Sequence, residues 1–205
     1  MKVLLINGSP RIGGNTADAL LEMEKVFHAE GIETVTLQIG NRDIRGCIAC
    51  NKCNELGRCM FDDAVNEAAK LLEECDGMVV GSPVYYASAN GTLVSFLDRL
   101  FCSTSFDKTM KVGAAIAVAR RGGLTATMDE LNKYFSISSM PIASSQYWND
   151  VHGFAVGEAA QDGEGLQTMR TLARNMSFLI KSIALGKEAY GFPEKEERVR
   201  TNFVR

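Results

Sequence analysis

Residues 1–16, MKVLLINGSPRIGGNT, join an apolar run to a glycine-rich turn, and this junction decides how the rest of the chain is organised. Val3 to Ile6 form a short apolar run bounded by Asn7 and Gly8, which is typical of a buried strand. After Thr16 the apolar residues recur every three or four positions, which predicts a helix. A strand that passes through such a turn into a helix aims unpaired backbone N–H groups at one point. That point suits a phosphate.

The turn does not match the two most familiar nucleotide fingerprints. Its glycines are not spaced as G-x-G-x-x-G, and no Gly-Lys-Ser/Thr follows them, so a dinucleotide fingerprint and a P-loop are both disfavoured. An ordinary strand-to-helix turn, in which the glycines only relieve backbone strain, is the alternative.

Length and composition predict one soluble domain. The chain has 205 residues, 46% hydrophobic and 23% charged, with a formal net charge of −3. This charge gives no electrostatic case for a nucleic acid or an anionic membrane as partner. No apolar run approaches the roughly 20 residues that span a bilayer, and the N-terminus lacks the features of a secretory signal. We therefore expect a cytoplasmic protein, whose six cysteines are free thiols or metal ligands rather than disulfides.

Strand and helix patterns alternate along the chain. We expect a domain over residues 1–186, a loop over 40–60 inserted after the second strand, and a charged tail over 187–205. This alternation predicts an α/β, three-layer doubly wound fold with a five-stranded parallel sheet, order 2-1-3-4-5, and helices on both faces. The expected strands are 3–6, 32–39, 78–81, 111–119 and 140–144, and the expected helices are 16–30, 62–74, 90–102, 125–135 and 162–184, the last ended by Gly186.

Three loops should meet at the switch point of this sheet, where ligands bind. Ser9–Thr16 supplies hydroxyls, amides and Arg11 for a terminal phosphate. Ser82–Tyr86 supplies a rigid proline and two aromatic rings beside a flat ligand, although the rings could simply cover the sheet edge. Ala119–Gly123 supplies glycine backbone and, from Arg120 or Arg121, a cation for an anionic ring edge. A phosphate at one end and a planar ring at the other describe FMN.

The segments GSPRIGGNT, DGMVVGSPVYYASANGTLVSFLDR and RRGG resemble the flavodoxin-like, NADPH-dependent FMN reductase superfamily over most of residues 1–145. The resemblance implies non-covalent FMN, with its phosphate on Ser9, Arg11, Asn15 and Thr16 and its ring on the two later loops. The Pro10-Arg11 pair departs from true flavodoxins and favours an enzyme. The predicted cofactor-binding residues are Ser9, Arg11, Gly13, Asn15, Thr16, Ser82, Pro83, Val84, Tyr85, Tyr86, Ala119, Arg120, Arg121, Gly122 and Gly123.

The loop over 40–60 contains Cys47, Cys50, Cys53 and Cys59, with the spacing C-x2-C-x2-C-x5-C. Such clustering suits an iron–sulfur cluster or a zinc ion, and free thiols are the third possibility. The motif is similar to that of iron–sulfur flavoproteins in the same superfamily, as is the segment 162–180. That resemblance implies a [4Fe–4S] cluster that passes single electrons to the flavin.

Residues outside these motifs are expected to have structural roles. Cys75 and Cys102 fall on apolar helix faces and are expected to pack in the core. Asp98 and Arg99 are expected to pair locally or to cap a helix.

The predicted function is that of an FMN-dependent oxidoreductase that uses NAD(P)H to reduce a quinone, a nitro compound, free flavin or a protein acceptor. The flavin carries the chemistry, so no catalytic acid or base is named. One alternative is an iron–sulfur flavoprotein that carries electrons without small-molecule turnover. Another is a redox-sensing interaction protein whose cysteine loop switches a partner. The resemblance also implies a homodimer or homotetramer.

Overall fold

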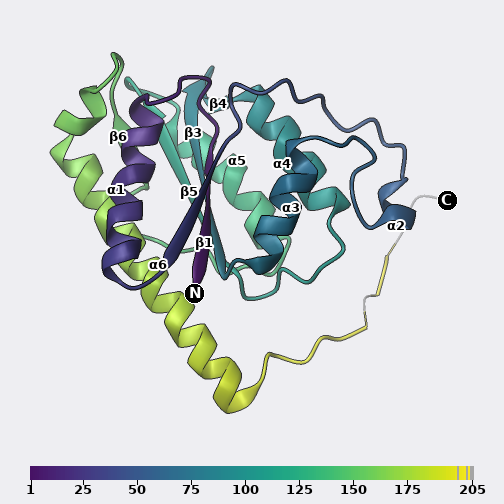
Figure 1. Ribbon diagram of the computed structural model, residues 1–205. Coiled ribbons are helices and arrows are strands. Elements are labelled where there is room, and N and C mark those ends of the chain that lie inside the picture. The colour runs from purple at the N-terminus through teal and green to yellow at the C-terminus, as the bar shows by residue number, and fades with distance from the viewer. Residues whose placement is uncertain (198, 202, 204–205) are drawn as a thin grey trace.

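The computed structural model describes residues 1–197, 199–201 and 203, and it shows a parallel sheet covered by helices on both faces (Figure 1). The parallel strands follow the order β2-β1-β3-β5-β6, and β4 forms an antiparallel hairpin with the end of β3. Counted without the hairpin strand, this is the predicted 2-1-3-4-5 order. The strands are β1 Lys2–Asn7, β2 Glu33–Gln38, β3 Gly77–Tyr85, β4 Ser88–Ala89, β5 Val112–Ala119 and β6 Asp150–His152.

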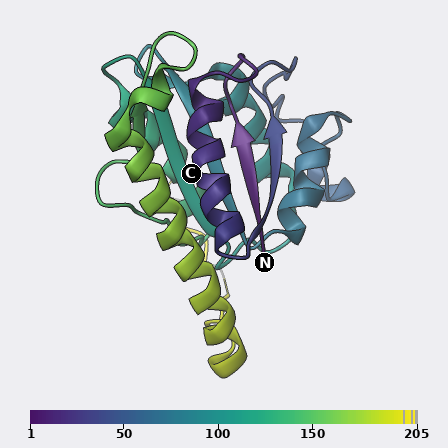
Figure 2. The ribbon, with the colours of Figure 1, turned by 60° about the vertical axis from the view of Figure 1, so that its left-hand side comes forward.

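Helices connect successive strands and form the two outer layers. In Figures 1 and 2, α1 and α6 lie side by side on one face of the sheet, while α3, α4 and α5 cover the other. The helices are α1 Asn15–Ala29, α2 Cys53–Leu56, α3 Ala64–Glu74, α4 Gly91–Ser103, α5 Leu124–Ser136, the short 3-10 helix η1 Glu158–Gln161 and α6 Gly163–Tyr190.

Alternation along β1 divides the hydrophobic core between the two faces, because successive strand side chains point to opposite sides. Val3 and Leu5 pack with α1 and α6, whereas Leu4 and Ile6 pack with α3 and α4. All four side chains are buried. The strand is therefore apolar on both faces, as a central strand of a doubly wound sheet must be.

The prediction of a fifth strand at residues 140–144 was wrong. This segment makes only an isolated bridge, between Ile142 and Gly113, and the fifth parallel strand is β6, where no strand was predicted. The Asn149 side chain donates a hydrogen bond to the Ala115 carbonyl, and the Asn149 carbonyl accepts one from Ala117. These contacts place Asp150–His152 beside β5. Pro141 has no N–H to contribute to a ladder.

The last helix is longer than predicted. It continues through Gly186 to Tyr190, and Gly191, with φ of +74°, follows its end. A single glycine costs a helix only about 1 kcal/mol, which is too little to end a helix of this length. The final turns of α6 extend past the edge of the sheet (Figure 2). Beyond the helix, Lys195 forms a 2.6 Å ion pair with Asp107.

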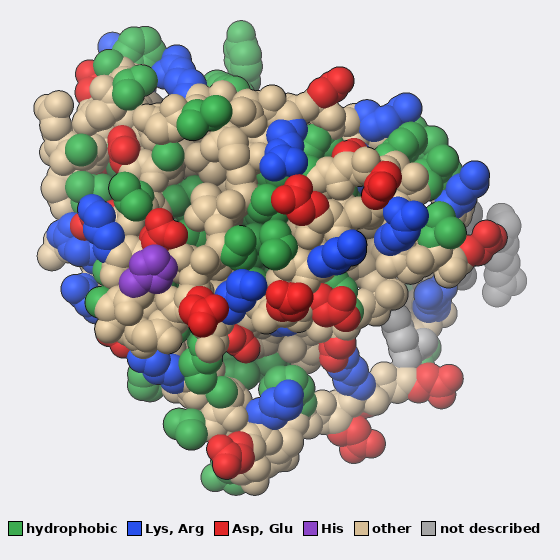
Figure 3. Space-filling view, in the orientation of Figure 1, with side chains coloured by type: hydrophobic (Ala, Val, Ile, Leu, Met, Phe, Trp, Pro, Cys, Tyr) green, Lys and Arg blue, Asp and Glu red, His purple; other side chains and the backbone are tan. Residues whose placement is uncertain are grey.

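On the face seen in Figure 3, acidic and basic side chains are interspersed with hydrophobic ones. Among the helices of the described residues, none is both long and apolar enough to pass through a bilayer.

Candidate functional site

The three predicted loops converge on one cavity of about 280 Å³ at the carboxyl ends of β1, β3 and β5. In Figure 1 these strand ends lie at the top of the molecule. The sheet brings the loops together because parallel neighbours end at the same edge. The cavity is lined by Ser9, Arg11, Asn15, Thr16, Pro83, Val84, Tyr85, Val118, Ala119, Arg120, Gly153 and Phe154.

The first loop presents donors toward this cavity. Gly14 is the N-cap residue of α1 and provides no side-chain cap, so the first N–H groups of the helix lack that partner. Ser9 and Thr16 are buried, while the Arg11 side chain is exposed. Uncapped N–H groups, two hydroxyls and a guanidinium are the chemistry that binds a phosphate monoester.

A close approach of two backbones fixes the position of this loop. A Cβ atom at Gly40 would lie 2.1 Å from the Gly8 carbonyl oxygen, so only glycine fits where the chain leaves β2. The Gln38 side chain also donates a hydrogen bond to the Ser9 carbonyl. The first loop therefore rests on the start of the cysteine loop, residues 40–60.

A segment that the sequence patterns did not identify, residues 153–159, lies against the same cavity. The Asn15 amide donates to the Ala155 carbonyl at 2.9 Å and accepts from the Ala159 N–H at 3.2 Å. Arg11 donates to the Phe154 carbonyl at 3.5 Å, and the Arg120 guanidinium lies 5.6 Å from the Phe154 ring centroid. The Asn15 side chain is thus bonded to this segment.

The 153–159 segment is stiffened from within by a carboxylate. Glu158 accepts hydrogen bonds from the backbone N–H groups of Phe154 and Ala155, which lower the pKa of Glu158. The only sequence signal for this segment is the aromatic Phe154 between glycines, a pattern too common to single out a binding loop.

The second loop is a hairpin, β3 to β4, whose two turn residues adopt left-handed conformations. Tyr86 and Ala87 have φ of +51° and +61°, which is unfavourable for side chains other than Asn, Asp or Gly. Glu130 of α5 secures the hairpin by accepting hydrogen bonds from Ser88 and from the Ala89 N–H. Tyr85 lines the cavity, whereas Tyr86 projects into solvent.

Several predicted cofactor residues do not line this cavity. The buried Ser82 hydroxyl donates to the Pro83 carbonyl and accepts from the Asn90 N–H, and so joins the hairpin to α4. Gly123, with φ of +91°, packs against Ala87 and begins α5. The other predicted residues outside the lining are Gly13, Tyr86, Arg121 and Gly122.

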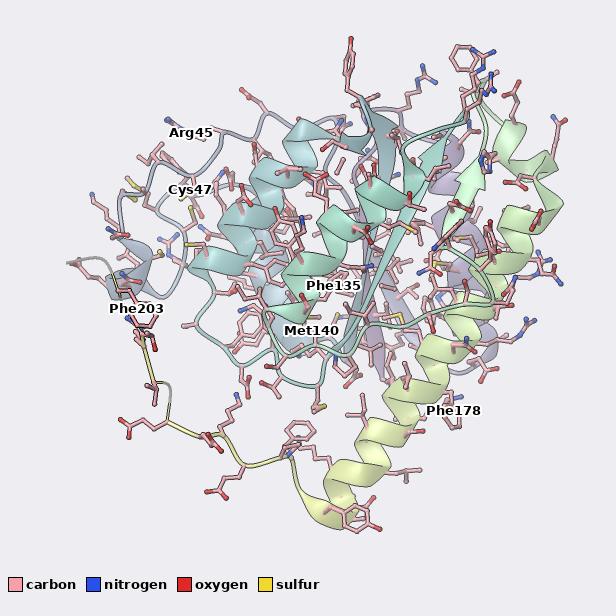
Figure 4. The ribbon with its side chains drawn as sticks, turned by 180° about the vertical axis from the view of Figure 1, so that it is seen from behind. Arg45, Cys47, Phe135, Met140, Phe178 and Phe203 are labelled. Carbon is pink, nitrogen blue, oxygen red and sulfur yellow. The ribbon has the colours of Figure 1, made fainter. Side chains whose placement is uncertain are left out.

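The cysteine loop forms a second cavity, of about 170 Å³, between residues 47–61 and α4. Arg45 and Cys47 lie on this loop at the outer edge of the molecule (Figure 4). The loop is mostly exposed, and Ala49 and Asn51 adopt left-handed conformations. All four motif cysteines line the cavity, which is comparable in size with engineered cavities that hold a benzene ring.

The fourth motif cysteine is held much more firmly than the other three. Cys59 is buried, and its backbone N–H and carbonyl bond to the side-chain amide of Asn66 at 3.1 and 3.0 Å. The Arg99 guanidinium donates to the Cys59 sulfur from two nitrogens. Cys47 and Cys50 are exposed, and Cys53 is half-buried.

The cysteine cavity has the thiol donors that a [4Fe–4S] cluster or a zinc ion uses. A [4Fe–4S] cluster takes one thiolate at each iron, so its ligands surround a volume. A zinc ion needs four sulfurs within about 2.3 Å of one point. In the described part of the chain, no group of three or more His, Cys, Asp or Glu side chains is placed to hold a metal ion. Four thiols around a cavity are the donor set of a cluster.

Of the two remaining cysteines, only Cys75 behaves as predicted. Cys75 is buried, and burial raises the pKa of its thiol to about 11. Cys102 is exposed and lines the cysteine cavity, so its assignment to the core was wrong. Desolvation, reinforced by the neighbouring Cys53 and Cys47 thiols, raises the pKa of Cys102. The exposed end of α4 faces the loop, which helix periodicity alone could not reveal.

Asp98 and Arg99 do not pair with each other, and neither caps a helix. Asp98 accepts a 2.6 Å hydrogen bond from the Tyr134 hydroxyl. Arg99 points the other way, toward Asp63 and Cys59.

Comparison with known proteins supports the same reading. Residues 1–155 match the family model of the NADPH-dependent FMN reductases. An iron–sulfur flavoprotein of Methanocaldococcus jannaschii is 35% identical over 191 residues, which cover 89% of this chain and 99% of that protein. An iron–sulfur flavoprotein of Methanosarcina thermophila is 29% identical over 192 residues, 92% of this chain and 100% of that protein.

Two solved structures show how widely the fold is shared. RosB, solved with 8-demethyl-8-formylriboflavin-5'-phosphate, superposes with a TM-score of 0.70 at 14% identity, covering 100% of this chain and 92% of that one. An archaeal flavodoxin superposes with a TM-score of 0.59 at 14% identity, covering 88% and 99%. Fold, loop convergence and sequence similarity lead to one conclusion: the chain belongs to the flavodoxin-like, NADPH-dependent FMN reductase family, in its iron–sulfur flavoprotein subgroup.

Proposed function

We propose that this protein is an FMN-dependent oxidoreductase that takes electrons from NAD(P)H and passes them to a quinone, a nitro compound, free flavin or a protein acceptor. The observation that carries the proposal is the single cavity in which the three loops of β1, β3 and β5 meet. Family membership supports FMN as its occupant.

Within this proposal, each side of the cavity has a distinct role toward FMN. Ser9, Thr16 and the α1 N-terminus bind the phosphate, and Arg11 neutralises its charge. Pro83, Val84 and Tyr85 line the flat ring, and Arg120 faces its polar edge. When bound, the flavin supplies hydride acceptance and one- or two-electron transfer. The lining residues would position the ring and limit the access of water to it.

The cysteine cavity is proposed to hold a [4Fe–4S] cluster on Cys47, Cys50, Cys53 and Cys59. The donor set fits, and the curated relatives are named as iron–sulfur flavoproteins. The cluster would supply one-electron transfer, so this cavity favours a second candidate function, that of an electron carrier with little small-molecule turnover.

Anaerobic reduction experiments test the two candidates. Purified protein is mixed with NADPH or NADH without oxygen, and the flavin and iron–sulfur absorbances are followed before and after adding a quinone, a nitroaromatic or free FMN. Reduction by a nicotinamide followed by repeated turnover supports the oxidoreductase. Slow nicotinamide oxidation with fast reoxidation by a protein acceptor supports the carrier. A colourless protein that binds no added FMN contradicts both.

We also propose that the protein forms a homodimer or homotetramer through α6. Phe178, Leu185 and Tyr190 are large exposed side chains on this helix, and Phe178 points away from the body of the molecule (Figure 4). Exposed apolar residues on one helix are typical of a subunit interface. Sedimentation of the wild type and of Phe178→Glu tests this, with a monomeric wild type as the contrary result.

A further inference from the structure

Arg99, on α4, is the largest side chain that is fully buried among the described residues, with 1% of its surface exposed. Burying a charge is unfavourable unless the charge is paired and hydrogen-bonded. The partners of Arg99 therefore explain why a charged residue occupies this position.

Asp63 supplies the counter-charge. Its two carboxylate oxygens accept hydrogen bonds from Arg99 Nη1 and Nη2 at 2.7 and 3.1 Å, which is the two-pronged geometry that arginine favours. Arg99 Nη1 also donates to the Arg45 carbonyl at 3.3 Å. Two guanidinium N–H groups remain directed elsewhere.

Those N–H groups are directed at a cysteine sulfur. Arg99 Nε and Nη2 lie 3.4 and 3.2 Å from the Cys59 Sγ. A guanidinium with a nearby carboxylate does not need a sulfur acceptor for charge balance. Arg99 thus connects the Asp63 carboxylate to Cys59, the motif cysteine whose backbone is already bonded to Asn66.

The Phe61 ring keeps this arrangement in place. The guanidinium carbons of Arg99 and Arg45 lie 5.1 and 4.9 Å from its centroid. Arg45 is exposed, and among the hydrogen bonds of the described residues none joins its side chain to Cys59. Arg45 is therefore a natural control, because it makes the same ring contact without the contact to sulfur.

We propose that Arg99 is a positioning residue that holds Cys59 as a ligand and raises the reduction potential of the cluster in the cysteine cavity, with Asp63 moderating the effect. The inference rests on the proposed function, since it requires the cavity to hold a cluster. Arg99 lies outside the four-cysteine motif, so the motif alone does not reveal this control of the reduction potential.

The sign of the effect follows from charge. Reduction adds one electron to the cluster, so N–H donors and positive charge near a ligating sulfur stabilise the reduced form. Removing the Arg99 charge should lower the potential. Neutralising Asp63 should raise it, because the guanidinium then acts on the sulfur without a compensating anion. Asparagine is also a good helix N-cap residue, so Asp63→Asn preserves the cap on Val65.

The experiment compares the wild type, Arg99→Met, Arg99→Lys, Asp63→Asn and Arg45→Met as purified holoproteins. Redox titration followed by electron paramagnetic resonance gives the cluster potential, and FMN content reports the fold. We expect Arg99→Met to shift the reduction equilibrium about tenfold toward the oxidised cluster, which is about 59 mV for one electron. Arg99→Lys should shift it in the same direction by less, and Asp63→Asn in the opposite direction. Arg45→Met should stay within about threefold of the wild type, because solvent screens an exposed charge.

Opposite shifts in Arg99→Lys and Asp63→Asn support the inference even if Arg99→Met retains no cluster. Shifts of the same sign in these two variants, or shifts no larger than that of Arg45→Met, overturn it. If the variants contain a cluster whose reduction potential equals that of the wild type, the proposed function stands and only the role of Arg99 is refuted. A wild type purified without oxygen that contains FMN but neither iron nor sulfide overturns the cluster proposal, and this inference with it.

Discussion

The two cavities of this protein are built in different ways. The cavity at the sheet edge is formed by loops that leave three hydrogen-bonded parallel strands, whose registers fix where each loop begins. The cysteine cavity is formed by a long loop that has one short helix, α2, and is mostly exposed. Its shape depends on a few side chains, chiefly Asn66, Arg99 and Asp63.

This difference indicates how each site responds to its ligand. The sheet edge is organised by backbone hydrogen bonds and by a core on both faces, so its cavity should keep its shape without FMN. The cysteine loop has little core of its own, and of its four motif cysteines only Cys59 is buried. We expect that loop to gain order when its ligand binds, as metal sites outside a packed core generally do. Three predictions test this contrast, and a fourth concerns a buried thiol outside both cavities.

The largest effect is expected at the cysteine loop. Cys50→Ala should remove most of the iron and acid-labile sulfide while FMN binding and the melting temperature stay near those of the wild type, because no motif cysteine lines the sheet-edge cavity, which touches only the start of the loop near Gly40. Cys102→Ser is the control, since Cys102 lines the same cavity but lies outside the motif. If Cys50→Ala also loses FMN, the two cavities are not independent.

The next effect is expected where the two regions touch. A Cβ atom at Gly40 would lie 2.1 Å from the Gly8 oxygen and 2.3 Å from the Ser9 carbonyl carbon. Gly40→Ala should therefore destabilise the protein by about 3 kcal/mol in urea unfolding and weaken FMN binding. Gly186→Ala, on an open position of α6, should instead stabilise it by about 0.5–1 kcal/mol. Equal effects of the two substitutions would contradict the close approach of the backbones.

A smaller effect should follow from removing the cation of the first loop. Arg11→Ala should weaken FMN binding by about tenfold to a hundredfold, because a hydrogen bond to a charged group contributes roughly 1.5–3 kcal/mol. Arg121→Ala should change the affinity by less than about twofold, since Arg121 does not line the cavity. Fluorescence titration of the FMN-free protein measures both, and a larger loss in Arg121→Ala would reverse the assignment.

The smallest effect concerns a cysteine outside both cavities. Burial raises the pKa of Cys75 to about 11, so the folded state keeps a proton that the unfolded state releases from about pH 9 upward. Stability should fall between pH 9 and 11, with a loss of about 1.4 kcal/mol at pH 10 for one proton. Cys75→Ala should lack this part of the pH dependence in urea unfolding. Identical pH profiles would mean that Cys75 does not titrate as a buried thiol.

The sequence patterns correctly predicted the parts of the fold that regular strands and helices determine. The apolar runs and their glycines were enough to place β1, β3 and β5 and to bring their loops to one edge. The fifth strand was misplaced because β6 has only three residues, too few to form an apolar pattern, and the Asn149 contacts to β5 beside it leave no such pattern either. Gly186 was predicted to end the last helix, but α6 continues through it to Tyr190, because one glycine costs a helix only about 1 kcal/mol.

Side-chain contacts between distant segments could not be predicted in the same way. Asn15 was expected to bind phosphate, yet its amide is bonded to residues 155–159, about 140 positions away. Arg99 and Cys102 were assigned structural roles because helix periodicity does not show what lies opposite a helix end. The contacts of Arg99 and Cys102 arise only when the cysteine loop folds back over α4.

The measurement that tests the central claim most directly is the cofactor content of protein purified without oxygen. We predict bound FMN together with about four iron and four acid-labile sulfide per FMN, the stoichiometry of a [4Fe–4S] cluster on the four motif cysteines. Protein that contains neither FMN nor iron, and takes up neither when they are supplied, would contradict it.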